Sequence, residues 1–156
     1  EKDLRKYHTV LETIEEPEDL TLSTLRAFEK KNRPERVIIE YNPLWGVNKL
    51  RAMEMPPGWG ICQEIVIIDG GSYEIYRNNM QSVFTEMVQD ADMVIFGHTH
   101  VPFLECSSDM IVVNPGSIAK PRQSDHQPTY GWMEIDGGKL KLEIRRAADD
   151  QPILCY

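Results

Sequence analysis

The sequence predicts an α/β protein in which a parallel-sheet βαβ-type N-terminal part is followed by antiparallel β strands, in one mixed compact domain. Up to about residue 96, strand-like apolar runs alternate with helix-like segments, which is typical of parallel strands joined by crossovers. Beyond that point the sequence shows no apolar residues at helical spacing, and short apolar runs follow one another instead. We therefore expect an α/β part over residues 1–96 and a β-rich part over residues 97–156.

The elements of the first part follow from two patterns. Apolar residues at helical spacing behind a hydroxyl side chain predict helices, and runs of β-branched residues predict strands buried on both faces. The expected strands cover residues 8–14, 36–41, 64–69 and 92–96, and the expected helices cover residues 21–31, 47–55 and 73–89.

The second part is expected to hold three short strands. Residues 110–113 form one, and residues 130–135 and 140–144 form a hairpin around Asp136-Gly137-Gly138, a turn sequence that joins antiparallel strands. The tail from residue 147 to residue 156 is expected to be frayed.

Composition excludes several classes of function. The net charge of −8, without a cluster of basic residues, argues against nucleic-acid binding and against an anionic membrane surface. No apolar run approaches the roughly 20 residues that a membrane span needs. The cysteines Cys62, Cys106 and Cys155 are far apart and form no CxxC pair, which favours a reducing, cytoplasmic compartment.

The motif FGHTHVPF, at residues 96–103, is the strongest chemical signal. His98 and His100 follow an expected strand directly after a glycine that allows a sharp turn. Two imidazoles so spaced in a loop can reach one metal ion or two adjacent ions. Taken alone, the pair is compatible with a site for a divalent metal, with Mn, Ni, Fe and Zn as candidates, and also with two polar loop histidines that bind nothing.

The series GHTHVP, NPGS and KPR, followed by a strand led by Tyr130, resembles the C-terminal part of YfcE-type calcineurin-like metallophosphoesterases over about residues 92–146. In that family the two histidines of this motif bind metal in a two-metal centre, so the resemblance implies that His98 and His100 are metal ligands and that a small phosphoester is the substrate. It also implies a substrate loop beside the site, with Lys120 nearby, built from Asn114, Gly116, Ser117 and Arg122.

Other motifs of that family are absent from the sequence. It has no opening Asp-x-His, no Gly-Asp and no Gly-Asn-His. We therefore expect the chain alone to be inactive or weak as an enzyme, unless a complementing chain or an oligomer supplies further ligands.

Residues 1–96 resemble the middle of a CobW-type P-loop GTPase, through stretches such as KKNRPERVIIEYNPLW and the long segment that ends in DADMVIF. The resemblance implies that Glu40 is the acidic residue that faces the nucleotide-bound Mg²⁺. However, no GxxxxGK[ST] loop is present, so no nucleotide is expected. The alternatives to a phosphoesterase are thus a CobW-like GTPase or metallochaperone fragment that has lost nucleotide binding, and a non-catalytic scaffold.

Together the two resemblances suggest a chimera or fusion joined within residues 92–97. Ligand sites in open α/β sheets lie at the carboxyl ends of the strands. Glu40 and Asp69 follow or end expected strands, as do His98 and His100, so these four side chains are the candidate ligands of a single divalent metal.

Overall fold

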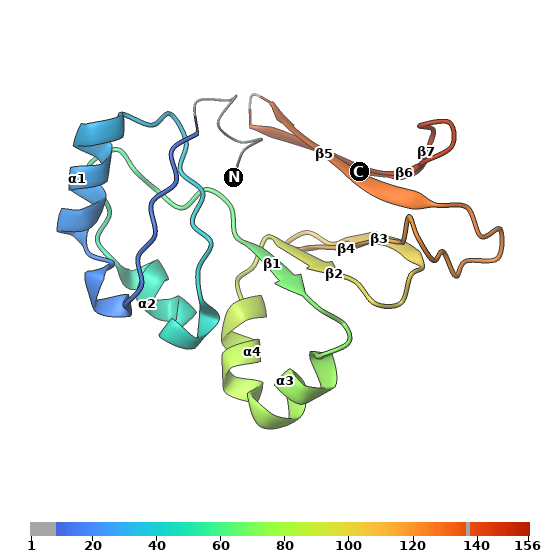
Figure 1. Ribbon diagram of the computed structural model, residues 1–156, viewed down its shortest axis with the longest axis horizontal. Coiled ribbons are helices and arrows are strands. Elements are labelled where there is room, and N and C mark those ends of the chain that lie inside the picture. The colour runs from blue at the N-terminus through green and yellow to red at the C-terminus, as the bar shows by residue number, and fades with distance from the viewer. Residues whose placement is uncertain (1–8, 137) are drawn as a thin grey trace. The chain divides into compact units, whose positions relative to one another are not determined.

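The computed structural model describes residues 9–136 and 138–156, and the chain forms two compact units, Glu1–Ile61 and Cys62–Tyr156. The α/β class is confirmed, because a sheet with parallel strands is followed by a separate antiparallel sheet (Figure 1). The expected boundary at residues 96 and 97 falls within the second unit, between two strands of one sheet.

In the described part of the N-terminal unit, the regular elements are helices and 3₁₀ turns. The helix α1, Leu22–Asn32, begins behind Thr21, whose hydroxyl accepts a hydrogen bond from the Thr24 N–H at 3.2 Å. It ends at Arg33, which has a left-handed backbone that closes the last turn. The shorter helix α2, Val47–Ala52, and two 3₁₀ turns, η2 (Pro17–Asp19) and η3 (Pro43–Trp45), complete the unit. Both expected helices of this region are confirmed.

Two strands that the sequence predicted in the N-terminal unit are not formed, so these predictions are wrong. Residues 36–41 form no strand, and Ile38 is 89% exposed rather than buried. Residues 9–14 also form no strand, and His8 lies outside the described residues. A β-branched run favours extended backbone, but a strand needs a neighbour for its N–H and C=O groups. None of the described residues of this unit forms a strand, so that neighbour is missing.

The second unit holds a four-stranded sheet in the order β1-β2-β4-β3. The strands β1 (Ile65–Ile68), β2 (Met93–Phe96) and β4 (Ile111–Pro115) are parallel, and β3 (Pro102–Cys106) is antiparallel to β4. Three strands therefore match the expected ones, and β3 was not expected. The prediction that β1 is buried on both faces is wrong, because β1 is the outermost strand of the sheet and Ile67 is 75% exposed.

The crossover from β1 to β2 consists of two helices, where the sequence predicted one over residues 73–89. They are α3, Tyr73–Asn79, and α4, Gln81–Val88. Met80 separates them, with φ −136° and ψ 38°, outside the helical region.

An antiparallel sheet follows, with β5 (Thr129–Asp136), β6 (Lys139–Arg146) and β7 (Pro152–Cys155) in that order. The expected hairpin is confirmed, although Gly137 of its turn lies outside the described residues. The expectation of a frayed tail is wrong. Beyond the end of β7, Tyr156 exchanges two backbone hydrogen bonds with Leu142, of 2.7 and 2.9 Å.

One apolar cluster joins the two sheets of this unit. Its buried members come from both sheets and are Met93, Ile111, Val113, Leu142 and Ile144. Because Met93 and Ile144 are fully buried, the strand that leads to the histidine loop is anchored in the core of the unit. None of the helices in residues 9–136 and 138–156 has the length and hydropathy to cross a membrane.

Glu143, on β6, is a buried carboxylate with two cationic partners. Arg145 donates to it through Nε at 2.8 Å, and Lys141 Nζ lies 3.0 Å from its other oxygen. The hydrogen bond from Arg145, followed by that from Lys141, holds the pKa of Glu143 below its ordinary value. Asp150 accepts from Tyr130 and then from Arg145, which lowers its pKa in the same way.

These contacts predict a loss of stability in acid. A carboxyl whose pKa is lower in the folded than in the unfolded state stabilises the fold above its unfolded pKa, and this contribution disappears as the pH falls through the folded pKa. We expect the melting temperature to drop below about pH 4, where carboxyls begin to protonate. The drop should be smaller in Glu143→Gln, measured by thermal unfolding from pH 3 to pH 7. Glu105→Gln, at an exposed position on β3, is the control. Equal pH profiles for the wild type and Glu143→Gln would contradict the assignment.

Candidate metal centre

The order of the first sheet brings three loops to the same edge of the sheet, the one at which the parallel strands end. Because β1, β2 and β4 are parallel, their carboxyl ends meet at the same side of the sheet. Ile68 is paired with Phe96, and Ile95 with Val113. The residues that follow each pair, Asp69, His98 and Asn114, therefore lie at or just beyond this edge.

The histidine loop crosses over the end of β4. Since β4 lies between β2 and β3, the chain must pass over its carboxyl end to reach β3. Thr99 lies between the two histidines, and its Oγ1 accepts a hydrogen bond of 2.8 Å from Nδ2 of Asn114. The Oδ1 of Asn114 accepts from the Gly116 N–H at 2.9 Å, and Asn114 is fully buried. Its amide therefore ties the histidine loop to the loop after β4.

Both histidines have a left-handed backbone, with φ 75° at His98 and φ 61° at His100. Such values are uncommon outside glycine and are worth notice where they cluster, although histidine adopts them more readily than most residues. Both values fall within the five-residue loop, residues 97–101, that joins β2 to β3.

The tautomer of His100 follows from its hydrogen bond. Its Nδ1 lies 2.8 Å from the carbonyl oxygen of Lys120, which can only accept. Nδ1 must therefore carry the proton, and in the neutral ring the lone pair is left on Nε2. A backbone carbonyl that fixes the ring in this way is a common arrangement for metal-binding histidines. The Arg122 N–H also donates to the His100 carbonyl, at 3.0 Å.

Asp69 and His98 converge on one point beside Gly71. A Cβ built on Gly71 would lie 3.3 Å from Nδ1 of His98, and 3.4 and 3.5 Å from the two carboxylate oxygens of Asp69. The Gly71 N–H donates to Asp69 Oδ1 at 3.0 Å, and the Ser72 hydroxyl to Oδ2 at 3.3 Å, so the carboxylate is oriented. Asp69 and His98 are both exposed.

These donors are of the right kind for a divalent ion, and the space a Cβ would fill at Gly71 forms a small cradle between them. A carboxylate and an imidazole are ordinary ligands of such ions, at about 2.0–2.2 Å. Within the described residues, however, no group of three or more His, Cys, Asp or Glu side chains lies together to hold an ion. The edge therefore supplies part of a coordination shell. Glu40 belongs to the N-terminal unit, where it is exposed and outside any strand, so its role stays a prediction.

The remaining residues of the predicted substrate loop lie directly after β4. Gly116 has φ 80°, and Ser117 Oγ accepts from the Lys120 N–H at 3.0 Å. Arg122 and Lys120 are exposed, and both are tied to His100 through the backbone contacts described above.

Sequence reasoning missed Thr99 and the glycine pair Gly70–Gly71 as parts of this edge. The only signal was position: Thr99 is enclosed by the two histidines, and the glycines directly follow an aspartate at a strand end.

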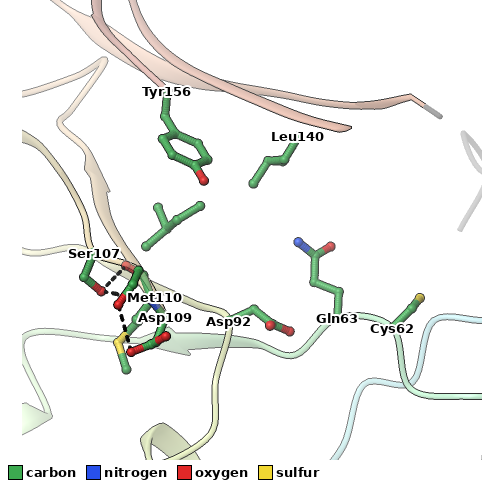
Figure 2. A pocket seen from close by; sticks show the side chains of 10 residues that line it. Cys62, Gln63, Asp92, Ser107, Asp109, Met110, Leu140 and Tyr156 are labelled. Atoms are coloured by element: carbon green, nitrogen blue, oxygen red, sulfur yellow. Dashed lines mark hydrogen bonds between the residues drawn. The ribbon is translucent and has the colours of Figure 1, made fainter. Parts of the chain in front are cut away.

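A pocket of about 230 Å³ lies at the opposite end of the same strands. Figure 2 shows Tyr156 and Leu140 on one side of it and Asp92, Gln63 and Cys62 on the other. Of these residues, Cys62, Gln63 and Asp92, together with Ser107 and Asp109, precede the amino ends of β1, β2 and β4, whereas Leu140 lies on β6 and Tyr156 follows β7. The pocket thus contains none of the residues that the sequence predicted as a site.

Comparison with known proteins relates the C-terminal part of the chain to one family. Residues 62–138 match the calcineurin-like phosphoesterase superfamily domain. A probable metallophosphoesterase of Methanothermobacter thermautotrophicus is 48% identical over 56 residues, which are 36% of this chain and 31% of that protein. A probable metallophosphoesterase of Mycoplasma pneumoniae is 27% identical over 82 residues, 49% of this chain and 50% of that protein. The chain thus spans only about a third to a half of the length of these relatives.

Among solved structures, a Streptococcus pneumoniae protein described as a predicted phosphoesterase is similar, with a TM-score of 0.43 and 26% identity. The similarity covers 58% of this chain and 53% of that one. The family match starts at Cys62, where the second compact unit also starts. Residues 62–96, which the sequence analysis assigned to a CobW-like part, therefore fall within the phosphoesterase match, and the CobW resemblance of the preceding residues stays a prediction.

Proposed function

With residues 62–138 related to the calcineurin-like phosphoesterases, we propose that Asp69 and His98, with His100 on the same loop, contribute part of a divalent-metal site for phosphoester hydrolysis. The observation that carries the proposal is the convergence of the His98 imidazole and the Asp69 carboxylate beside Gly71. The hydrogen bond that leaves Nε2 of His100 free to bind supports it.

A bound divalent ion in this class activates water and neutralises phosphoryl oxygens. The role of the chain's own residues is to bind the ion and to orient its ligands. The Lys120 carbonyl fixes the ring of His100, and the Gly71 N–H fixes the carboxylate of Asp69. Arg122, with Asn114, Gly116 and Ser117, belongs to the proposed loop for a small phosphodiester or phosphomonoester. Mn, Ni, Fe and Zn remain the candidate ions, with imidazole and carboxylate as ligands.

The isolated chain is expected to hydrolyse phosphoesters weakly or not at all. A two-metal centre needs about six protein ligands, mostly carboxylates and histidines. The described residues bring two such side chains to one point. A complementing chain, or a further copy of this one, would have to supply the others.

Metal content tests the proposal. After incubation with Mn²⁺ or Zn²⁺ and brief dialysis, we expect the wild type to retain more metal, measured by mass spectrometry, than His98→Ala/His100→Ala. His126→Ala is a matched control, because His126 also has a positive φ, of 50°, and its Nδ1 also lies near a carbonyl, that of Pro121, at 3.2 Å. Equal metal in the wild type and the double variant would end the proposal.

Two further assays separate the proposal from the alternatives. Hydrolysis of bis-p-nitrophenyl phosphate with added Mn²⁺ reports on the phosphoesterase class, and a high rate from the isolated chain would contradict its expected weakness. Calorimetric titration with GTP reports on the CobW-like alternative. A chain that binds neither metal nor nucleotide would be a non-catalytic scaffold.

A further inference from the structure

We propose that the glycine pair Gly70–Gly71 positions the metal site, because Gly70 lets the loops after β1 and β2 touch and Gly71 keeps the space between Asp69 and His98 open. This inference rests on the proposed metal function of the same edge, and it names two positioning residues rather than ligands.

Gly70 stands where no side chain fits. A Cβ at this position would lie 2.6 Å from the carbonyl oxygen of Gly97 and 2.9 Å from Cβ of His98. Carbon atoms in proteins pack at about 3.5–4.0 Å, so both contacts are overlaps. The Gly97 oxygen belongs to the backbone and cannot rotate away. Any other residue at position 70 must therefore push the histidine loop away from the loop that carries Asp69.

Gly71 has a different part. The three heavy atoms nearest to its missing Cβ are Nδ1 of His98 and the two carboxylate oxygens of Asp69, all between 3.3 and 3.5 Å away. These are the donor atoms of the proposed site, and no backbone atom is among them. To bind one ion at about 2.0–2.2 Å, the imidazole and the carboxylate must both close in on a shared point. A methyl group at position 71 would occupy the space through which they approach each other.

The backbone itself tolerates alanine at position 71, because Gly71 is not among the glycines with positive φ. Gly97 offers a matched control one residue from His98. It too lacks a positive φ, and a Cβ there would meet nothing within 4 Å. Gly71→Ala and Gly97→Ala therefore add the same methyl group to neighbouring loops, and only the first methyl lies between the donors.

The experiment compares metal affinity in four proteins: the wild type, Gly71→Ala, Gly70→Ala and Gly97→Ala. Titration with Zn²⁺ should show affinity about tenfold to a hundredfold weaker in Gly71→Ala and Gly70→Ala, a loss typical of disturbed support around a metal ligand, and unchanged affinity in Gly97→Ala. Circular dichroism and thermal unfolding confirm that each variant is folded. If Gly70→Ala fails to fold, Gly71→Ala decides the matter.

A second readout needs no metal. In the metal-free wild type we expect nuclear Overhauser contacts between the Gly71 α-protons and the His98 ring, and we expect them to vanish in Gly70→Ala. Wild-type affinity in Gly71→Ala, with metal bound by the wild type, overturns this inference and leaves the proposed function intact. A wild type that binds no metal overturns both, and absence of the Gly71–His98 contacts overturns the positioning geometry by itself.

Discussion

Replacing Gly116 by alanine is expected to destabilise the second unit by about 3 kcal/mol or more. Gly116 has φ 80°, a left-handed conformation that costs a residue with a Cβ roughly 1–3 kcal/mol. A Cβ there would also lie 2.1 Å from Oγ1 of Thr129. Thr129 is buried and its hydroxyl donates to the Pro115 carbonyl at 2.8 Å, so it cannot yield without losing that bond. Such overpacking adds about 1–3 kcal/mol, and urea denaturation measures the sum.

Gly138 separates the two causes. It has a similar φ, of 76°, but a Cβ there would meet nothing within 4 Å. Gly138→Ala should therefore lose only the conformational part, about 1 kcal/mol. Combining Gly116→Ala with Thr129→Ala should recover part of the larger loss, since the overlapping hydroxyl is gone. Equal losses in Gly116→Ala and Gly138→Ala would show that the overlap with Thr129 is not the cause.

Replacing Asn114 by alanine is expected to cost about 2–4 kcal/mol and to weaken metal binding as well. The buried amide makes two hydrogen bonds, to Thr99 Oγ1 and from the Gly116 N–H, of 2.8 and 2.9 Å. Alanine leaves the Gly116 N–H without this acceptor, and an unmade buried bond costs about 1–3 kcal/mol. It also frees the loop between His98 and His100 from β4, so metal affinity should fall about tenfold.

Thr99→Val tests the same connection from the other side, because it removes the acceptor but leaves Asn114 and Gly116 in contact. Its loss of stability should be smaller than that of Asn114→Ala, while its loss of metal affinity should be similar. Asn78→Ala, at an exposed position on α3, is the control for an amide outside the site. If Asn114→Ala bound metal as tightly as the wild type, the Asn114 amide would have no role in supporting the metal site.

Local sequence patterns predicted those elements whose partners lie nearby or whose burial is unambiguous. The capped helix α1, the strand β2 and the hairpin of β5 and β6 are of this kind. Predicting residues 36–41 as a strand failed because apolar β-branched residues indicate extended backbone without indicating a neighbour to pair with. The strands β3 and β7 were missed because their short, mixed sequences become strands only through pairing with β4 and β6.

For the candidate site, the sequence indicated which strand ends carry Asp69 and His98, but not the distances between their side chains. The alternation of expected strands and helices placed Asp69 and His98 at the carboxyl ends of parallel strands. In the structure these strands are neighbours, and this is what brings the two side chains together. That a methyl group at Gly71 would touch both side chains depends on the register of β1 and β2 and on the close approach at Gly70, which no local pattern encodes.

The left-handed backbone of His98 and His100 has an evolutionary consequence. Each such residue costs of order 1–3 kcal/mol, although less for histidine than for most side chains, whereas glycine adopts the conformation freely. A lineage under selection for folding alone would gain stability by drifting to glycine at either position. If the proposed site lost its function, we would therefore expect His98 and His100 to be among the first residues of the loop to be substituted.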